Sequence, residues 1–218
     1  MGHPALSPTA RSTVRRGRAR TRTDRRELYE LLDSCLVCHL GLVVDDAPVV
    51  LPTGYGRDGD VLYLHGSTGS ASMLGAASGV PVSIAVTRLD GVVYARSVFH
   101  HSMNYASAVI HGTATPVVEE DAKLHGLRVL TEHLAPGSWA ATRQPTRKEL
   151  AATSVLAVPL YEASVKLRTG PPGDEEADVA AGTSWAGVLP LRQTWGLPQP
   201  CPLLPAGTPV PDRVTYRP

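Results

Sequence analysis

Seven short runs of apolar and β-branched residues, separated by turn signals, constrain the fold of this chain more than any other feature. Three separators, Asp45-Asp46, Arg57-Asp58-Gly59-Asp60 and Asp90-Gly91, have the composition of tight hairpin turns. Short strands joined by tight turns pair antiparallel. The pattern predicts a mainly β fold, an antiparallel barrel or split barrel with a few peripheral helices. The runs are 36–44, 49–55, 61–65, 82–87, 92–98, 105–115 and 155–161.

Helical signals are fewer. Asp24 followed by Glu27 has the form of a capping box, and apolar side chains at helical spacing come after it. Further helices are expected over 70–77, 119–134 and 146–152. The spacing predicts that the apolar face of the helix over 119–134 consists of Ala122, Leu124, Leu127, Leu130 and Leu134.

Both ends of the chain differ in composition from the middle, which suggests a central domain over 23–170. Residues 1–22 carry six arginines and no acid, and they predict a flexible basic tail, either solvated or bound to phosphates or an acidic partner. Residues 171–218 hold ten of the 19 prolines, which exclude long helices and central strands there. Trp185 and Trp195 lie among them, so we expect an extended arm that packs on the barrel or on a partner subunit.

Charge and hydropathy exclude several classes of protein. Lys and Arg number 21 against 20 Asp and Glu, a net charge of +1, which argues against a dedicated nucleic-acid binder. No apolar run is long enough to span a membrane, and the N-terminus has no secretory signal. We therefore expect a cytoplasmic protein whose partner is a small molecule or another copy of itself.

Cys35, Cys38 and His39 form a C-x-x-C-H sequence. Covalent haem attachment of this type belongs outside the cytoplasm, and a thioredoxin-like pair needs a parallel sheet. A zinc site needs four ligands, and Cys201 stands alone elsewhere in the chain. We interpret Cys35 and Cys38 as buried, inert thiols and expect no metal site.

Two segments carry the densest polar chemistry. Residues 63–74 end a predicted strand and open a helix through Gly, Ser and Thr, an arrangement that holds anions or simply caps a helix. His65 lies at that strand end, facing a ligand or buried in the core. Residues 89–105 add an arginine, His100, His101 and Asn104 near predicted strand ends. Such groups pair across a subunit interface or line a pocket.

Several segments together resemble the pyridoxamine 5′-phosphate oxidase-like proteins of the FMN-binding split-barrel fold, in particular the nitroimidazole-resistance-type flavoproteins. The run from Asp90 to Tyr105 is the most specific part of the resemblance. The segments are 37–42, 51–56, 62–67, 87–105, 153–157, 166–172 and 185–190, and they cover most of residues 23–191.

The resemblance implies a homodimer of six-stranded antiparallel split barrels with FMN at the interface. It implies two-electron transfer from a nicotinamide donor to a small organic acceptor, with His65 as the catalytic residue that positions or protonates the acceptor. Lys166 and Trp185 are expected from the other subunit. The implied cofactor-binding residues are Thr53, His65, Gly66, Ser67, Ser70, Ala71, Ser72, Met73, Ser102, Asn104, Tyr105, Lys166 and Trp185.

The chain departs from the family at the cofactor phosphate. Ser72 and Ala106 stand where this branch usually carries basic residues. Each charge-assisted contact to phosphate is worth roughly 1.5 to 3 kcal/mol, so FMN affinity is expected to fall unless other cations substitute. Arg88, Arg96 and the tail arginines are the candidates for that substitution.

The alternative to replacing the phosphate cations with other arginines is a pocket that binds a different ligand. It would hold haem through His65, His100 or His101, or a deazaflavin, or a substrate without cofactor. Oxidation of pyridoxamine phosphate itself is not expected, because the C-terminal arm lacks a basic cluster for the substrate's phosphate.

Overall fold

The computed structural model describes residues 5–7, 9–182 and 184–217. Its strands are β1 (Thr21–Arg22), β2 (Val37–Val44), β3 (Ala47–Asp58), β4 (Val61–Ser67), β5 (Pro81–Tyr94), β6 (Ser102–Thr113), β7 (Thr115–Pro116), β8 (Thr153–Pro159), β9 (Glu162–Arg168) and β10 (Gly187–Pro190). Its helices are α1 (Arg25–Ser34), α2 (Ala71–Ala77), α3 (Glu120–Leu134), α4 (Ser138–Ala141), α5 (Arg147–Ala152), α6 (Glu176–Ala181) and α7 (Asp212–Thr215), with 3₁₀ turns η1 (Arg18–Arg20) and η2 (Val98–His100).

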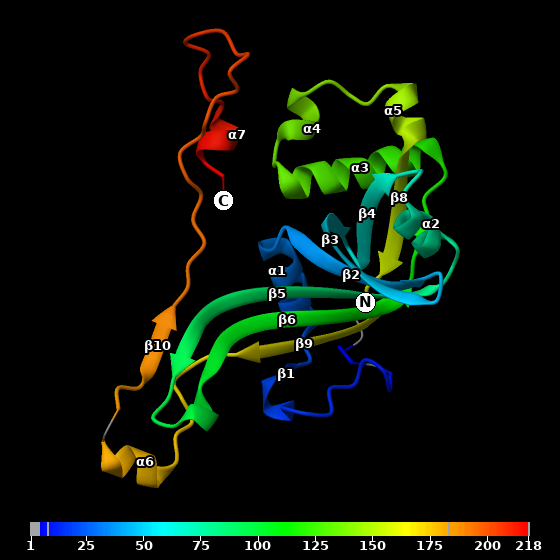
Figure 1. The fold of residues 1–218 in the computed structure, drawn as a ribbon. Coiled ribbons are helices and arrows are strands. Elements are labelled where there is room, and N and C mark those ends of the chain that lie inside the picture. Colours follow the sequence, from blue (N-terminus) through cyan, green and yellow to red (C-terminus); the bar gives the residue numbers. More distant parts are fainter. Residues whose placement is uncertain (1–4, 8, 183, 218) are drawn as a thin grey trace.

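All strand pairs in the described part of the chain are antiparallel, in the order β1-β9-β6-β5-β2-β3-β4-β8-β7, and β10 pairs with β5. The sheet coils on itself, and α3 covers β3, β4 and β8 at one end (Figure 1). This confirms the predicted mainly β, antiparallel fold with a few helices, and it is the architecture of a split barrel.

Side chains alternate between two faces of this sheet. Leu40 on β2 lies opposite Ile84 on β5, and both are fully or almost fully buried. The preceding pair, His39 and Ala85, points to the other side. We call the side of Leu40 the inner face, which encloses the hydrophobic core, and the side of His39 the outer face.

The turn predicted at Asp90-Gly91 is wrong, because β5 runs straight through it. The pairing of β5 with β6 shifts by one residue between Leu89 and Gly91, so Asp90 is the extra residue of a β-bulge. Gly91 is needed for a close approach: a Cβ there would lie 2.7 Å from the Leu189 carbonyl oxygen of β10. The run 92–98 therefore divides into the end of β5, a bend and the start of η2.

The other two hairpins are confirmed. Asp45 and Asp46 both have positive φ, 49° and 59°, as the two central residues of a type I′ turn require. Gly59, with φ 53°, turns β3 into β4. Strand β9 was not among the seven predicted runs.

The expected helices form within one or two residues of their predicted bounds. The Asp24 side chain caps α1 by accepting a hydrogen bond from the Arg26 N–H, 2.9 Å. The buried face of helix α3 differs from the predicted one. Gly126 and Leu130 are its buried residues, whereas Ala122 and Leu134 are exposed. A Cβ on Gly126 would lie 2.9 Å from the Val155 side chain, so the helix approaches the sheet through its glycine.

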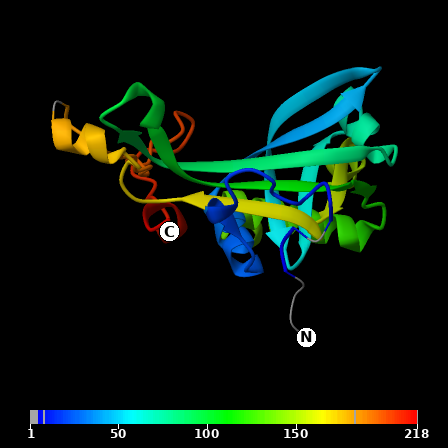
Figure 2. The same cartoon turned by 90° about the horizontal axis from the view of Figure 1, so that it is seen from below.

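The N-terminal segment is not a flexible tail over its described residues. Leu6 is buried in the core, and the Ser7 N–H donates to the Ala163 carbonyl at 2.7 Å. Strand β1 then pairs with β9, and Figure 2 shows the blue segment running across the yellow strand. An apolar side chain close to the start and the free edge of β9 explain this docking, which composition alone did not reveal.

The C-terminal arm touches the barrel mainly through β10. Beyond it, the chain extends away from the sheet to α7, as Figure 1 shows, and residues 191–211 are exposed. Trp185 is 70% exposed and Trp195 60%, although the Arg217 guanidinium lies 4.2 Å from the Trp195 ring centroid. Within the described residues, no helix is long and apolar enough to cross a membrane.

Candidate functional site

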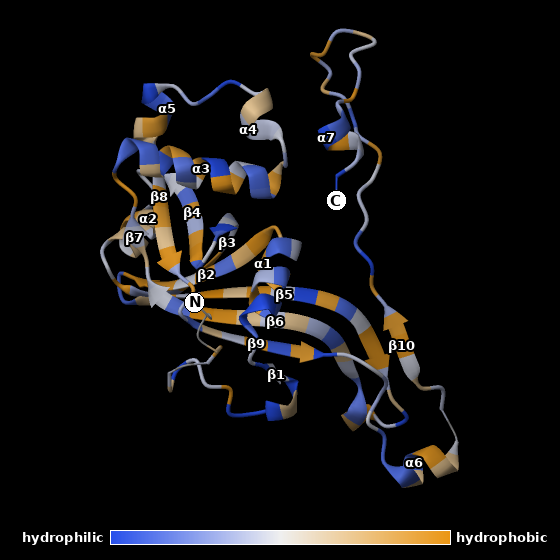
Figure 3. Ribbon diagram, turned by 180° about the vertical axis from the view of Figure 1, so that it is seen from behind, coloured by the Kyte–Doolittle hydropathy of each residue, from blue (hydrophilic) through white to orange (hydrophobic). Residues whose placement is uncertain are grey.

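Much of the outer face of the sheet is apolar and open to solvent, although α3 covers it on β3, β4 and β8. Figure 3 shows hydrophobic stretches along β5, β6 and β10, and outer-face side chains on these strands are exposed. Apolar groups of this extent are normally covered in a soluble protein. The exposed apolar residues on this face are Val37, Val43, Val50, Leu89, Val92, Tyr94, Met103, Val109 and Leu189.

Three of the predicted site residues project from this face. His65 follows the buried Leu64 on β4 and is exposed. Tyr105 on β6 and Lys166 on β9 likewise alternate with buried neighbours and are partly exposed. None of the three has a side-chain hydrogen bond or ion pair among the described residues, so their polar atoms are available to a ligand.

Gly54 leaves room beside His65. Tyr55 lies opposite Leu64, so the next residues along the two strands, Gly54 and His65, are neighbours on the outer face. A Cβ on Gly54 would meet no atom closer than 4.0 Å, the Leu36 carbonyl oxygen. Packing within the chain therefore does not require glycine at this position. In a strand, such a glycine often marks the close approach of a ligand or another backbone.

Thr53, Ser102 and Asn104 lie on the inner face instead. Thr53 is opposite the buried Cys38, and Ser102 is opposite the buried Val93. Asn104 is buried, and both its amide nitrogen and its amide oxygen form hydrogen bonds.

The Asn104 amide holds a turn in its own chain. Its Nδ2 donates to the Gly170 carbonyl at 3.2 Å, and its Oδ1 accepts from the Arg168 guanidinium. Arg168 also donates to the Gly170 and Pro171 carbonyls, at 3.1 and 3.0 Å. The structure thus gives Asn104 a structural role at the end of β9.

The loop from Gly66 to Met73 is built as a turn from β4 into α2. The Ser67 Oγ accepts from the Gly69 N–H at 3.2 Å, and the Ser70 Oγ from the Met73 N–H at 3.5 Å. Met73 is buried against Gly66, where a Cβ would come within 2.7 Å of it. Ser67 and Ala71 are exposed and Ser72 is half-buried, so this part of the loop remains open to solvent.

A single chain does not bring all the predicted residues together. His65 and Lys166 are separated by five strand spacings of about 4.8 Å, or about 24 Å along the sheet. Trp185 lies at the far end of β5, where its ring centroid is 5.9 Å from that of Tyr94. The structure groups Thr53, His65 and the loop at one end, and Ser102, Asn104 and Tyr105 farther along the sheet.

Comparison with known proteins identifies the family. The model described as pyridoxamine 5′-phosphate oxidase matches residues 24–167, more than half of the chain. The chain belongs to this family. No curated protein matches the sequence.

Two solved structures match nearly the whole chain. The FAD and haem binding protein from Mycobacterium smegmatis is 45% identical, with 90% of this chain and 96% of that chain covered and a TM-score of 0.87. The flavocytochrome Anf3 from Azotobacter vinelandii is 34% identical over 97% and 98%, with a TM-score of 0.91. A 5-nitroimidazole antibiotic resistance protein from Bacteroides thetaiotaomicron, 19% identical over 67% and 85% with a TM-score of 0.57, shares the fold.

Arg88 and Arg96, two of the candidates to replace the missing basic residues at the cofactor phosphate, already pair with carboxylates in this chain. The Arg88 guanidinium donates to Asp90 at 2.8 Å, and that of Arg96 donates to Asp174 at 2.7 Å. Asp174 is almost fully buried, and its pKa is lowered by hydrogen bonds from Arg96 in spite of its desolvation. Each arginine is neutralised locally, which leaves the N-terminal arginines.

The three histidines suggested for haem differ in their ring hydrogen bonds. The His101 Nδ1 accepts from the Ala95 N–H at 2.8 Å, so its Nε2 carries the proton and has no lone pair for iron. The His100 Nδ1 lies 2.8 Å from the Ser97 Oγ, and its Nε2 is 3.6 Å from a Glu175 oxygen. His65 has no ring partner, so His65 and His100 fit an axial role better than His101.

The interpretation of Cys38 as a buried, inert thiol can be tested by alkylation. Cys38 is fully buried, and burial raises the pKa of its thiol to about 12. Cys201 is exposed in the arm. At pH 8 we expect iodoacetamide to alkylate Cys201 in the folded protein and to leave Cys38 unmodified until denaturant is added, because the thiolate is the reactive species. Mass spectrometry of tryptic peptides checks this, and rapid native labelling of Cys38 would contradict the buried position.

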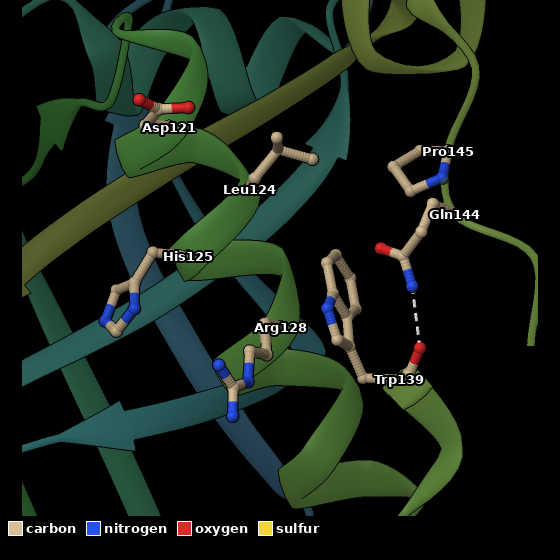
Figure 4. Close-up of a pocket in the computed structure, with 7 residues that line it drawn as sticks. All are labelled: Asp121, Leu124, His125, Arg128, Trp139, Gln144 and Pro145. Atoms are coloured by element: carbon tan, nitrogen blue, oxygen red, sulfur yellow. Dashed lines mark hydrogen bonds between the residues drawn. The ribbon is translucent and has the colours of Figure 1, made fainter. Parts of the chain in front are cut away.

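A pocket of about 440 Å³ lies apart from these residues, between α3 and the segment that joins α4 to α5 (Figure 4). The Gln144 side chain donates to the Trp139 carbonyl at 2.7 Å and fixes one wall. None of the predicted site residues lines it. The lining residues are Asp121, Leu124, His125, Arg128, Trp139, Gln144 and Pro145.

Proposed function

We propose that this protein is a flavin-dependent oxidoreductase that transfers two electrons between a nicotinamide donor and a small organic acceptor. The observation that carries the proposal is the match, over 90% of this chain at 45% identity, to a protein described as binding FAD and haem. The apolar outer face with its open position at Gly54 supports it, because a flavin ring requires a flat, apolar surface with a few polar groups at its edge.

We propose further that the functional unit is a homodimer with the flavin at the subunit boundary. The exposed apolar outer face and the 70% exposed Trp185 support burial against a second copy. The distance of about 24 Å along the sheet from His65 to Lys166 is consistent with these residues serving one cofactor from two chains.

The side chains have distinct roles in this proposal. A bound flavin supplies the two-electron chemistry. His65, exposed at the end of β4, would position or protonate the acceptor beside the bound flavin. Tyr105 and Lys166 supply hydroxyl and ammonium donors from the outer face. The apolar side chains around them exclude water from the ring.

Haem is the second candidate cofactor, alone or beside the flavin. The His65 ring, which has no hydrogen-bond partner among the described residues, and the Nδ1 contact of His100 support it, because a histidine would bind iron through an unprotonated ring nitrogen. In this role, His100 would exchange its distant Glu175 contact for the metal.

The test is the absorption spectrum of the purified protein, recorded alone and during titration with FMN, FAD and haemin. We expect flavin bands that bleach on addition of NADH or NADPH, together with a dimer in sedimentation analysis. A Soret band that is lost in His65→Ala or His100→Ala, and retained in the control His101→Ala, identifies the haem ligand. No chromophore bound under any condition would contradict the proposal.

A further inference from the structure

The N-terminal segment holds a group of arginines along the free edge of the sheet. Arg18 and Arg20 lie in η1, which packs against β9, and Arg15 and Arg16 precede it. All four are exposed, and no carboxylate pairs with any of them among the described residues. The segment is held in place by β1, where Thr21 pairs with Lys166.

Strand β9 adds two more cations beside them. Lys166 has no ion pair in the described part of the chain, and Arg168 hydrogen-bonds only to neutral oxygens. Burial and the nearby Arg20 guanidinium both lower the pKa of Arg168. We call Arg18, Arg20, Lys166 and Arg168 the basic edge.

Eight of the 18 arginines pair with carboxylates among the described residues, and the arginines of the basic edge are not among them. Carboxylates are plentiful, 20 against 21 Lys and Arg, so the fold could have paired these cations too. The paired arginines are Arg11 with Glu162, Arg22 with Glu27, Arg25 with Asp60, Arg26 with Asp24, Arg57 with Asp33, Arg88 with Asp90, Arg96 with Asp174 and Arg143 with Glu149.

Two cations in η1 and two on the neighbouring β9 repel one another, and a multivalent anion removes that repulsion. The guanidinium group suits phosphate especially, because its planar fork donates two parallel hydrogen bonds. The loop after β4 needs such help, since Ser72 and its neighbours from Gly66 to Met73 include no Lys or Arg. With Arg88 and Arg96 paired, the basic edge is the remaining source of cations considered for the flavin phosphate.

We propose that the basic edge, chiefly Arg18, Arg20 and Lys166, binds the phosphate groups of the flavin. The assignment rests on the proposed function. In the proposed dimer, the edge serves the flavin held by the loop of a second copy, since β9 and β4 are five strands apart in the sheet order of one chain. The N-terminal segment is then part of the cofactor site rather than a leader.

The experiment compares R18A/R20A with the control R26A/R192A, which removes the same charge from two exposed positions elsewhere. Each protein is titrated with riboflavin, FMN and FAD and followed by flavin fluorescence. In R18A/R20A we expect at least tenfold weaker binding of FMN and FAD, unchanged binding of riboflavin, and an unchanged thermal midpoint, because both side chains are exposed. The control should match the unsubstituted protein.

Four other outcomes of these titrations would overturn the phosphate assignment, the proposed function or both. Equal FMN and FAD affinities in R18A/R20A and the control would overturn the phosphate assignment alone. An equal loss of riboflavin binding would overturn it too, since the substitution would then act through the fold. Binding of ADP without competition with FAD would assign the edge to a separate nucleotide. Failure of the unsubstituted protein to bind any of the three flavins would overturn the proposed function and the assignment with it.

Discussion

Replacing Arg25 with methionine is expected to lower the free energy of unfolding by about 3 kcal/mol or more. The Arg25 side chain is 4% exposed at the start of α1. Its guanidinium donates to Asp60 Oδ1 at 2.9 Å and to the carbonyls of Leu160 and Tyr161 at 3.0 and 3.1 Å. One side chain thus joins the helix to the β3–β4 turn and to the β8–β9 turn, and the substitution removes the guanidinium donor from the two carbonyls and the cation from Asp60.

Arg26 provides the matched control. It is the next residue, its side chain is 82% exposed, and its ion pair with Asp24 lies in solvent. Arg26→Met should leave the urea midpoint of unfolding almost unchanged, because an exposed ion pair contributes little to stability. Urea denaturation of both variants followed by circular dichroism measures the difference. Equal losses of stability in the two variants would show that the buried hydrogen bonds of Arg25 do not stabilise the fold more than an exposed ion pair does.

The alternating strands were predictable because burial on one face of a sheet imposes a period of two on the sequence. Strand β6 shows this, since Ala106, Ala108 and Ile110 are buried while Tyr105 and Ser107 are not. Strand β9 was missed because Glu162, Lys166 and Arg168 dilute its apolar pattern. Its polar side chains point to the outer face and to the N-terminal segment. This orientation is known only once the pairing of β9 with β6 and β1 is known.

The bulge in β5 shows a second limit. Asp-Gly favours a tight turn on local grounds, but Gly91 serves the approach of β10, about a hundred residues away in the chain. A local turn signal carries no information about such a tertiary contact.

The candidate site was predictable only in part. The resemblance identified His65 and Lys166, which project from the outer face, together with Asn104, whose amide is occupied by Arg168 and Gly170. The N-terminal arginines read as a tail because their strand is two residues long and its partner, β9, was unrecognised. Their role depends on which carboxylates lie near them, and the sequence does not contain that information.

Gly54 and Gly56, two residues apart on β3, are expected to respond oppositely to the same substitution. A Cβ on Gly56 would lie 2.8 Å from the backbone carbonyl of Val129 in α3, and a helix backbone cannot move aside as a flexible side chain can. Gly56→Ala should therefore lower the free energy of unfolding by about 3 kcal/mol. At Gly54 nothing lies closer than 4.0 Å, so Gly54→Ala should be neutral or slightly stabilising.

The same pair separates stability from function. Urea denaturation without cofactor measures the stability difference, and FAD titration of Gly54→Leu measures the second effect. Because the space beside Gly54 lies outside the chain, the leucine should leave the unfolding transition of the cofactor-free protein unchanged and weaken FAD binding at least tenfold. Unchanged FAD affinity would place the flavin away from His65, since these two residues are neighbours on the outer face. Weakened FAD binding would instead explain why glycine occupies position 54, although packing within the chain does not require it there.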